Sequence, residues 1–327
     1  MRAALVKEFG PPSTLVIEDV PDPTPGPGQV LIEVAAVSIN YPDILVVEGT
    51  YQNLPDRPFS PGKEAAGRVL AVGPGVERVR VGQRVLTLIE YGGYAERVCV
   101  PEELVMELPD TMSYEEAAAF GLVYLTAYFG LVRRGQLAAG EWVLITAAGG
   151  GVGSAGVQLA KAYGARVIAL ARSDAKAELA RRQGADVVLR STPATLRDDL
   201  RAATDGHGVD VVLESLGGDY LTQAIRATAW EGRIVVVGFA SGGQNPIKPG
   251  HLLVKNISVA GLQGSDYRDR TPHLMRSAMA EMFALFEQGR LDAAVDTTFP
   301  LEKVADALQY VKDGKVKGKV VVTTGLR

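Results

Sequence analysis

Cysteine is almost missing from the sequence, since Cys99 is the single one among 327 residues. This excludes an intramolecular disulfide and the cysteine clusters of structural zinc sites, and it fits a reducing compartment, so we expect a cytoplasmic protein. A strong charge of either sign is missing too: 34 basic and 38 acidic residues give a formal net charge of −4. This balance offers no general attraction to nucleic acid or to an anionic membrane, and we expect neither as a partner.

Long hydrophobic runs are scarce as well. The uncharged run 142–160 is nearly long enough to cross a bilayer. Five glycines interrupt it, three of them consecutive at 149–151. A short strand, a glycine turn and a helix explain this run better than a membrane span, so we expect no span.

The sequence is long, and its two sections differ in their pattern of apolar and turn-forming residues. At roughly 100–200 residues per domain, its length predicts two domains. Before about residue 120, short apolar runs between glycine and proline turns indicate a β barrel or sandwich. After it, apolar strands alternate with helices, which is typical of a parallel sheet covered on both faces. The expected strands are 30–34, 67–72, 84–89 and 96–100 in the first section, and 142–146, 166–171, 186–189, 209–213, 233–237 and 257–262 in the second.

The helices and the last strand complete this outline. Ser113 and Glu116 predict a capping box that opens a helix. The polar segment 263–272 is expected to be a loop, and the strand-like run 319–323 resembles the first section, to which the chain would return. The apolar run Ile257–Leu262 would pair with a second subunit if it lies at a sheet edge, so we expect a homodimer; the alternative is an edge strand blunted by a loop. Further helices are expected over 174–183, 221–228, 272–288 and 301–311.

A glycine loop follows the first strand of the second section. The run 142–146 leads into Ala147-Ala-Gly-Gly-Gly-Val-Gly153, and an amphipathic helix comes next. This strand, turn and helix is the context that a dinucleotide-binding fingerprint requires. Its second and third glycines would be Gly150 and Gly153, with Ala148 at the first position. The cofactor-binding residues expected in this loop are Gly149, Gly150, Gly151, Val152 and Gly153.

The end of the next strand distinguishes NADPH from NADH. An acidic residue that would bind an NAD ribose is expected about 20 residues after the glycines, where Ala171 stands. Arg172 and Lys176 follow and would pair with a 2′-phosphate, while Ser173 would donate a hydrogen bond. Asp174 is better placed to cap the next helix. We therefore predict NADPH, the alternative being ordinary solvated charge at a strand–helix corner.

Several stretches along the chain match a known family. They are Ile39–Asp43, Pro61–Gly67, Gly92–Ala95, Tyr124–Tyr128, the glycine loop and Gly318–Val321. In these stretches the sequence resembles the zinc-free NADPH:quinone oxidoreductase (ζ-crystallin-like) branch of the medium-chain dehydrogenases/reductases. The resemblance implies an α/β protein in which a GroES-like β-rich catalytic domain, 1–123 and 266–327, encloses a doubly wound Rossmann domain, 124–265, with the active site in the cleft.

The same resemblance predicts that no metal is bound. Zinc-dependent members carry ligand cysteines where Asn40 and Leu122 stand here, and a ligand histidine where Lys63 stands. These three residues cannot form a zinc site. Without a Lewis acid, alcohol oxidation is disfavoured, whereas an electron-poor acceptor such as a quinone or an α,β-unsaturated carbonyl needs less help to accept a hydride.

The candidate catalytic residues lie around the lost metal position. Tyr51 matches the proposed acid of related enoyl-thioester reductases and would be either a proton donor or a wall of the cleft. Asn40 and Tyr41 could orient the acceptor or donate to its oxygen, and Lys63 could support that oxygen or form an ion pair.

Other residues are candidates for contacts with the cofactor. Thr126 resembles the family's threonine beside the nicotinamide. Ser215, Gly238 and Phe239 follow the fourth and fifth strands of the second section, and ligands bind at such carboxyl ends. Ser191 departs from the family, where many relatives have a tyrosine.

Three functions remain open from the sequence. The first is NADPH-dependent reduction of quinones. The second is reduction of conjugated enones, enals or enoyl thioesters by the same hydride chemistry. The third is a non-catalytic NADPH-binding protein, because a fold does not determine a function.

Overall fold

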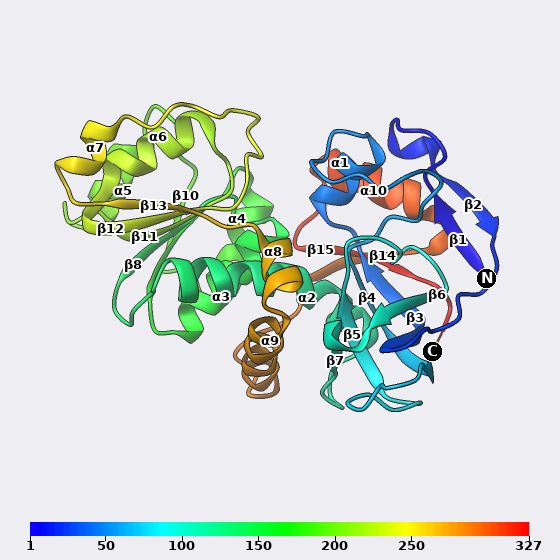
Figure 1. The fold of residues 1–327 in the computed structure, drawn as a ribbon. Coiled ribbons are helices and arrows are strands. Elements are labelled where there is room, and N and C mark those ends of the chain that lie inside the picture. The colour runs from blue at the N-terminus through cyan, green and yellow to red at the C-terminus, as the bar shows by residue number, and fades with distance from the viewer. Residues whose placement is uncertain (327) are drawn as a thin grey trace. The chain divides into compact units, whose positions relative to one another are not determined.

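The computed structural model describes residues 1–326 and divides the chain into two compact units (Figure 1). Unit 1 consists of Met1–Leu122, Ser265–Glu287 and Ala293–Arg327. Unit 2 consists of Val123–Gly264 and Gln288–Asp292. Helix α2 (Tyr114–Tyr128) contains the point at which the chain leaves unit 1 for unit 2. Within unit 1, β15 (Lys319–Thr323) pairs antiparallel with β3 (Gln29–Ser38), which joins the C-terminal strand to the sheet of the first section.

The main sheet of unit 1 has seven strands in the order β14-β15-β3-β4-β5-β7, with β6 also paired to β3. Alternate side chains of β3, such as Ile32 and Val34, are fully buried in its core, together with Val85 and Leu308. This period-two burial is the pattern of a strand with one face in a core. The remaining strands are β4 (Glu64–Val72), β5 (Arg84–Leu88), β6 (Arg97–Pro101), β7 (Val105–Glu107) and β14 (Val295–Pro300).

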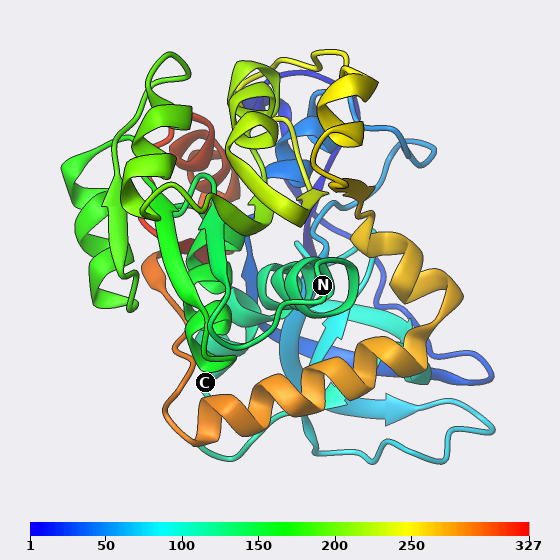
Figure 2. The ribbon, with the colours of Figure 1, turned by 90° about the vertical axis from the view of Figure 1, so that its left-hand side faces the viewer.

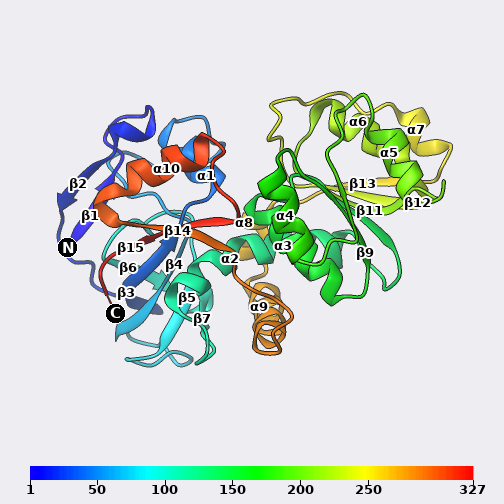
Figure 3. The same cartoon turned by 180° about the vertical axis from the view of Figure 1, so that it is seen from behind.

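Two short helices and a hairpin complete this core. Helix α1 (Tyr41–Val47) contacts α10 (Val304–Lys312), as Figure 3 also shows. Strands β1 (Arg2–Leu5) and β2 (Val16–Asp19) form an antiparallel hairpin near the N-terminus. The chain enters α1 directly from β3, so the residues between the two, Ile39 and Asn40, lie at the end of a central strand.

Unit 2 contains a six-stranded parallel sheet in the order β10-β9-β8-β11-β12-β13. Helices α5, α6 and α7 lie on one side of this sheet and α3 lies on the other (Figures 1 and 3). Because both faces are covered, the central strands contain continuous apolar buried runs, such as Val143–Ile145 of β8. The strands are β8 (Trp142–Ile145), β9 (Arg166–Leu170), β10 (Val187–Leu189), β11 (Val209–Glu214), β12 (Thr228–Val236) and β13 (Ser258–Gly261), and the helices are α3 (Gly151–Ala162), α4 (Asp174–Arg182), α5 (Leu196–Ala203), α6 (Gly218–Ala227) and α7 (Pro249–Leu253).

The strand order reverses direction at β8, whose neighbours are β9 and β11. In open parallel sheets, ligands bind beside such a reversal, at the carboxyl ends of the strands. The glycine loop follows β8 directly and is therefore at this position. The α/β architecture predicted from the sequence is confirmed.

One segment was predicted wrongly. The expected loop over 263–272 contains helix α8 (Gly264–Arg270), which leads into α9 (Pro272–Glu287), as Figure 2 shows in gold and orange. An ion pair between Asp266 and Arg270, 3.4 Å apart and four residues apart in sequence, stabilises this polar helix. The acidic residue stands in the first turn and the basic residue in the last, which suits the helix dipole.

Two other expectations concern surfaces. Strand β13 lies at the edge of its sheet, and the homodimer expected through it stays a prediction. Across the described residues 1–326, no helix combines the length and the apolar character that a membrane crossing requires.

Candidate active site

A buried polar centre in unit 1 brings together three strand ends. Ser38 is the last residue of β3, Glu64 the first of β4 and Lys319 the first of β15. Asn40 stands beside them as the N-cap of α1, where its side chain and that of Asp43 form a capping box. All five side chains are buried, with at most 4% of each residue exposed.

Hydrogen bonds connect the side chains of this centre to one another. The ammonium of Lys319 donates to Asn40 Oδ1 at 2.6 Å and to the carbonyl oxygen of Ile39 at 3.1 Å, and it lies 3.5 Å from Glu64 Oε1. The amide of Asn40 donates to Glu64 Oε1 at 2.9 Å, and the hydroxyl of Ser38 donates to the same oxygen. The backbone N–H of Leu122 donates to Glu64 Oε2 at 2.6 Å. Every polar atom of the Asn40 side chain is therefore used inside the centre.

Burial also changes the titration of this centre. It lowers the pKa of Lys319, which the charges of Glu64 and Asp43 partly restore. It raises the pKa of Asp43 to about 6, against the attraction of Lys63 and the hydrogen bond from the Asn40 backbone. That bond reaches Oδ2 at 2.8 Å, and the buried hydroxyl of Tyr94 also favours the charged carboxylate of Asp43.

These residues do not fit a zinc ion. The candidate ligand positions hold Asn40, Lys63 and Leu122, and zinc prefers cysteine, histidine or carboxylate donors. The carboxylate that bonds both Asn40 and Leu122, Glu64, already faces the ammonium of Lys319. Within residues 1–326, no group of three or more histidine, cysteine, aspartate or glutamate side chains could hold a metal.

Tyr51 and Lys63 lie close together in the same unit. The Lys63 ammonium is 4.4 Å from the centroid of the Tyr51 ring, and its side chain is 5% exposed. The turn after α1 brings Tyr51 there: Gly49 has a φ of +72°, and a Cβ on it would lie 2.7 Å from the Phe9 ring. Tyr41, another candidate, is 54% exposed.

Sequence reasoning missed several neighbours of these residues. Glu90 bonds Lys63 at 2.5 Å, and Arg268 bonds Glu90 at 2.7 Å. Lys319 and Glu64 lie inside two of the stretches that match the family, Gly318–Val321 and Pro61–Gly67. The match marked these stretches but assigned no role to the two residues. No sequence signal pointed to Glu90, because a single charged residue after a strand has no distinguishing pattern.

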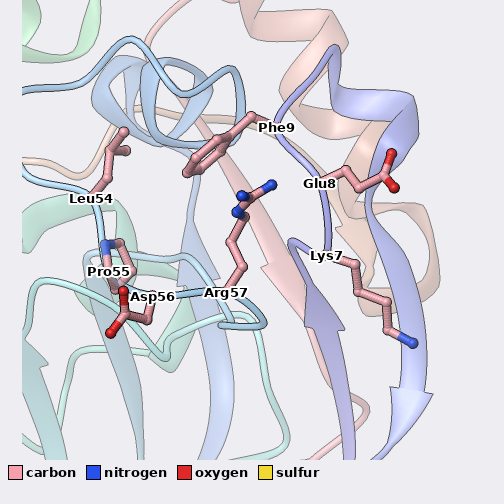
Figure 4. Close-up of a pocket in the computed structure, with 7 residues that line it drawn as sticks. All are labelled: Lys7, Glu8, Phe9, Leu54, Pro55, Asp56 and Arg57. Carbon is pink, nitrogen blue, oxygen red and sulfur yellow. The ribbon is translucent and has the colours of Figure 1, made fainter.

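An open hollow of about 670 Å³ borders the segment that follows Tyr51 (Figure 4). It lies between Lys7–Phe9 and Leu54–Arg57, and the Arg57 guanidinium stands 4.5 Å above the Phe9 ring. Its lining contains none of the predicted site residues, so we assign no function to it.

The glycine loop of unit 2 has the geometry that a dinucleotide site needs. A Cβ on Gly153 would lie 2.3 Å from the carbonyl oxygen of Ala147, so this position tolerates glycine only. Gly150 is the N-cap of α3, and a Cβ there would meet only that same carbonyl, at 3.4 Å. Gly151 and Val152 are the first residues of α3, so the loop leads directly into a helix N-terminus, the kind of position at which phosphate groups bind.

The corner after β9 carries the predicted phosphate-binding side chains. Ser173, not Asp174, is the N-cap of α4 and accepts from the Lys176 backbone N–H at 3.4 Å, so the expected cap by Asp174 is wrong. Asp174 instead pairs with Arg190, which also donates to the carbonyl oxygen of Arg172 at 3.2 Å. Lys176 lies against Gly149, where a Cβ would be 2.4 Å from the lysine Cβ. Ser191 bonds Asp199 at 2.6 Å.

The ends of β11 and β12 bring Ser215 close to Gly238 and Phe239. The N–H of Ala240 donates to the Ser215 carbonyl at 2.9 Å, and the Ser215 N–H donates to Thr146 Oγ1 at 2.7 Å. The buried hydroxyl of Ser215 has no hydrogen-bond partner among residues 1–326. Phe239 is 45% exposed, and Thr126 lies in the unit 2 part of α2.

Comparison with known proteins agrees with this geometry. The model "Alcohol dehydrogenase GroES-like domain" matches residues 26–110, and "Zinc-binding dehydrogenase" matches 151–281. A quinone oxidoreductase-like protein 2 homolog from Nematostella vectensis is 38% identical over 99% of this chain and 89% of its own length. The chain belongs to the medium-chain dehydrogenase/reductase family. The second model, despite its name, covers none of the three candidate ligand positions of this family member.

Solved structures of the same family cover the whole chain. The mycobacterial protein Rv1454c, complexed with NADPH, has a TM-score of 0.92 and 32% identity over 99% of this chain and 100% of its own. The CurK enoyl reductase has a TM-score of 0.89 and 31% identity over 98% of both chains. The predicted family and the predicted pair of folds, GroES-like and Rossmann, are thus confirmed. The protein is an NAD(P)-type oxidoreductase of this family.

Proposed function

We propose that this protein reduces quinones with NADPH, by hydride transfer and without a metal ion. The observation that carries the proposal is the bonding of Lys319. Its ammonium donates a hydrogen bond to Asn40 Oδ1 and faces Glu64 Oε1. These two oxygen atoms, which could otherwise be ligands of a metal, already interact with the ammonium of Lys319. A substrate bound beside such residues must be electron-poor already, because no Lewis acid polarises it. Quinones meet this requirement, and relatives named quinone oxidoreductases support it.

NADPH is the reductant, as the complexed mycobacterial relative supports. When bound, it supplies a hydride from its nicotinamide ring. Gly150 and Gly153 would hold the pyrophosphate at the N-terminus of α3, and Arg172 and Lys176 would pair with the 2′-phosphate. The free hydroxyl of Ser215 supports a further contact with the cofactor.

In unit 1, Tyr51 and Lys63 would bind the acceptor. The phenol can donate to an acceptor oxygen, and the neighbouring ammonium, 4.4 Å from the ring, favours negative charge there. Asn40 would act by positioning, since its amide is used by Glu64 and Lys319. Tyr41, which is more than half exposed, would contact the acceptor only as an outer wall.

A second candidate function is reduction of conjugated enones or enoyl thioesters. The hydroxyl of Tyr51 favours it, because an enolate formed by hydride addition needs a proton at carbon or oxygen, and the similarity to the CurK enoyl reductase supports it. In that case Tyr51 would be an obligatory acid, whereas a quinone can take its last proton from water.

The experiment is anaerobic oxidation of NADPH with a benzoquinone and, in parallel, with a short 2-enoyl thioester. Faster turnover of the quinone supports the first function, and faster turnover of the thioester supports the second. Tyr51→Phe should reduce enoyl turnover much more than quinone turnover. Tight NADPH binding without oxidation by either acceptor would contradict both and favour a non-catalytic NADPH-binding protein.

A further inference from the structure

Three charged side chains of unit 1, Lys63, Glu90 and Arg268, form what we term the charge clamp. Lys63 Nζ lies 2.5 Å from Glu90 Oε1, and Arg268 donates to Glu90 Oε2 at 2.7 Å. Their side chains are 5%, 17% and 11% exposed, respectively. Arg268 also bonds Asp269 at 2.6 Å, so charge in the cluster is balanced. A set of ions this well buried is held in one geometry.

The fold explains why these residues meet. Lys63 immediately precedes β4 and Glu90 follows β5, and the two strands pair antiparallel with Glu64 opposite Leu88. The N–H of Ile89 donates to the carbonyl of Lys63 at 2.9 Å, which continues this pairing by one residue. Lys63 and Glu90 therefore leave the same end of the sheet. Arg268 comes from α8, far away in the sequence.

Two tyrosine rings face the ammonium held by the clamp. Lys63 Nζ is 4.4 Å from the Tyr51 centroid and 5.3 Å from the Tyr91 centroid. Tyr91 in turn donates from its hydroxyl to the carbonyl of Asn53 and packs edge-on against Phe59, with centroids 5.5 Å apart. The ammonium thus contributes one ion pair and two cation–π contacts, which fix the segment that contains Tyr51.

A purely structural explanation of this arrangement is weak. Burying ions costs desolvation energy, and an apolar set of similar volume packs at least as well. Among the residues that the structure describes, Glu90 is the one carboxylate bonded to the Lys63 ammonium, and the ammonium also faces the two rings. The clamp therefore keeps a positive charge beside the hydroxyl-bearing ring of Tyr51.

We propose that Glu90 and Arg268 are positioning residues, which hold the ammonium of Lys63 beside Tyr51 for acceptor reduction. This inference rests on the proposed function. Quinone reduction takes up one hydride, which converts NADPH to NADP⁺, and leaves negative charge on the acceptor oxygen. The Tyr51 hydroxyl gives that oxygen a proton and regains one from water. Lys63 stabilises the charge that passes between them.

The test compares Lys63→Met, Glu90→Gln and Arg268→Met with the wild type. We expect kcat to fall about tenfold or more in Lys63→Met, with KM changed less than threefold, since the interaction forms mainly in the transition state. In Glu90→Gln and Arg268→Met, kcat should fall less than in Lys63→Met. The double variant Lys63→Met/Glu90→Gln should be no slower than Lys63→Met alone, because Glu90 acts through Lys63. Lys63→Arg should restore part of the loss.

Arg270→Ala is the matched control, because Arg270 lies in the same helix as Arg268 but is 79% exposed and pairs with Asp266 outside the clamp. It should leave kcat within twofold of the wild type, and all variants should keep their Kd for NADPH. Independent losses in Lys63→Met and Glu90→Gln that multiply in the double variant would overturn the proposal. So would an unchanged kcat in variants that are folded by circular dichroism.

A second readout separates this proposal from the proposed function. Chymotrypsin cleaves after tyrosine, so cleavage after Tyr51, located by mass spectrometry, reports on how firmly its segment is held. Glu90→Gln and Arg268→Met should accelerate this cut at least threefold, and Arg270→Ala should not. If the wild type reduces no acceptor yet the cut accelerates, the proposed function fails while the positioning stands. If the cut is unchanged, the positioning role is wrong.

Discussion

The two candidate sites of this protein are built on opposite principles. The glycine loop of unit 2 depends on the absence of side chains, since a Cβ on Gly153 would lie 2.3 Å from a backbone oxygen. The buried centre of unit 1 works by having matched side chains, with Lys319 bonded to Asn40 and close to Glu64. The first site depends on one stretch of chain, the second on residues up to 281 positions apart (38 to 319).

This difference predicts where each site is vulnerable. An added methyl group damages the glycine loop locally and leaves the rest of unit 2 folded. A lost charge in the buried centre leaves its partner unpaired in a low-dielectric interior, which costs stability in the whole of unit 1. The comparison would be wrong if an added methyl group in the glycine loop unfolded unit 2, or if a lost charge in the buried centre left the stability of unit 1 unchanged.

The largest effect is expected for Lys319→Met. Glu64, fully buried, would lose its ion pair with Lys319, and the free energy of unfolding should fall by about 3–5 kcal/mol. Denaturant unfolding measures this loss. In the Lys319→Met background, Glu64→Gln should recover part of it, because the unpaired charge is removed.

Lys317→Met is the matched control, since Lys317 is two residues away and exposed. It should change the free energy of unfolding by less than about 0.5 kcal/mol. Equal losses in the two variants would mean that the buried ion pair contributes nothing special to unit 1.

The next effect concerns ligand binding. Gly153→Ala should weaken NADPH binding roughly 100-fold, about 2.7 kcal/mol, because the new Cβ forces the Ala147 carbonyl out of place. NADPH fluorescence titration measures the Kd. Gly250→Ala, where a Cβ would meet nothing within 4 Å, should bind as the wild type does. A normal Kd in Gly153→Ala would show that the loop yields without loss.

The same contrast explains how far sequence reasoning reached. The glycine loop was predicted residue by residue, because strand, turn and helix are contiguous and periodicity reveals them. In the buried centre only Asn40 was named as a site residue, and its partner Lys319 was not. The pairing of β15 with β3 creates that contact, and no local pattern encodes a pairing between distant strands. The helix at 264–270 was missed because its polar sequence lacks an apolar face.

A smaller effect is expected at the phosphate-binding corner. Arg172→Ala should raise the Kd for NADPH about tenfold, or 1.4 kcal/mol, and leave the Kd for NADH within twofold, since only NADPH carries the 2′-phosphate. Arg181→Ala, in α4 and with a side chain that is 58% exposed, is the control and should change neither value. Equal weakening of both cofactors by Arg172→Ala would mean that the phosphate is held elsewhere.

The smallest effect tests whether the buried centre of unit 1 responds to pH. Burial raises the pKa of Asp43 in the folded protein from its ordinary 3.8 to about 6, so the folded state binds this proton more tightly than the unfolded state. Stability contributed by the protonated form is therefore lost as the pH rises through 6. Between pH 5 and 7 the wild type should lose about 1 kcal/mol more than Asp43→Asn, in which the side chain no longer titrates and can still accept from the Asn40 N–H. Urea unfolding at both pH values measures this difference. An identical pH dependence in the two proteins would place the pKa of Asp43 near its ordinary value and would make the centre, like the glycine loop, insensitive to pH.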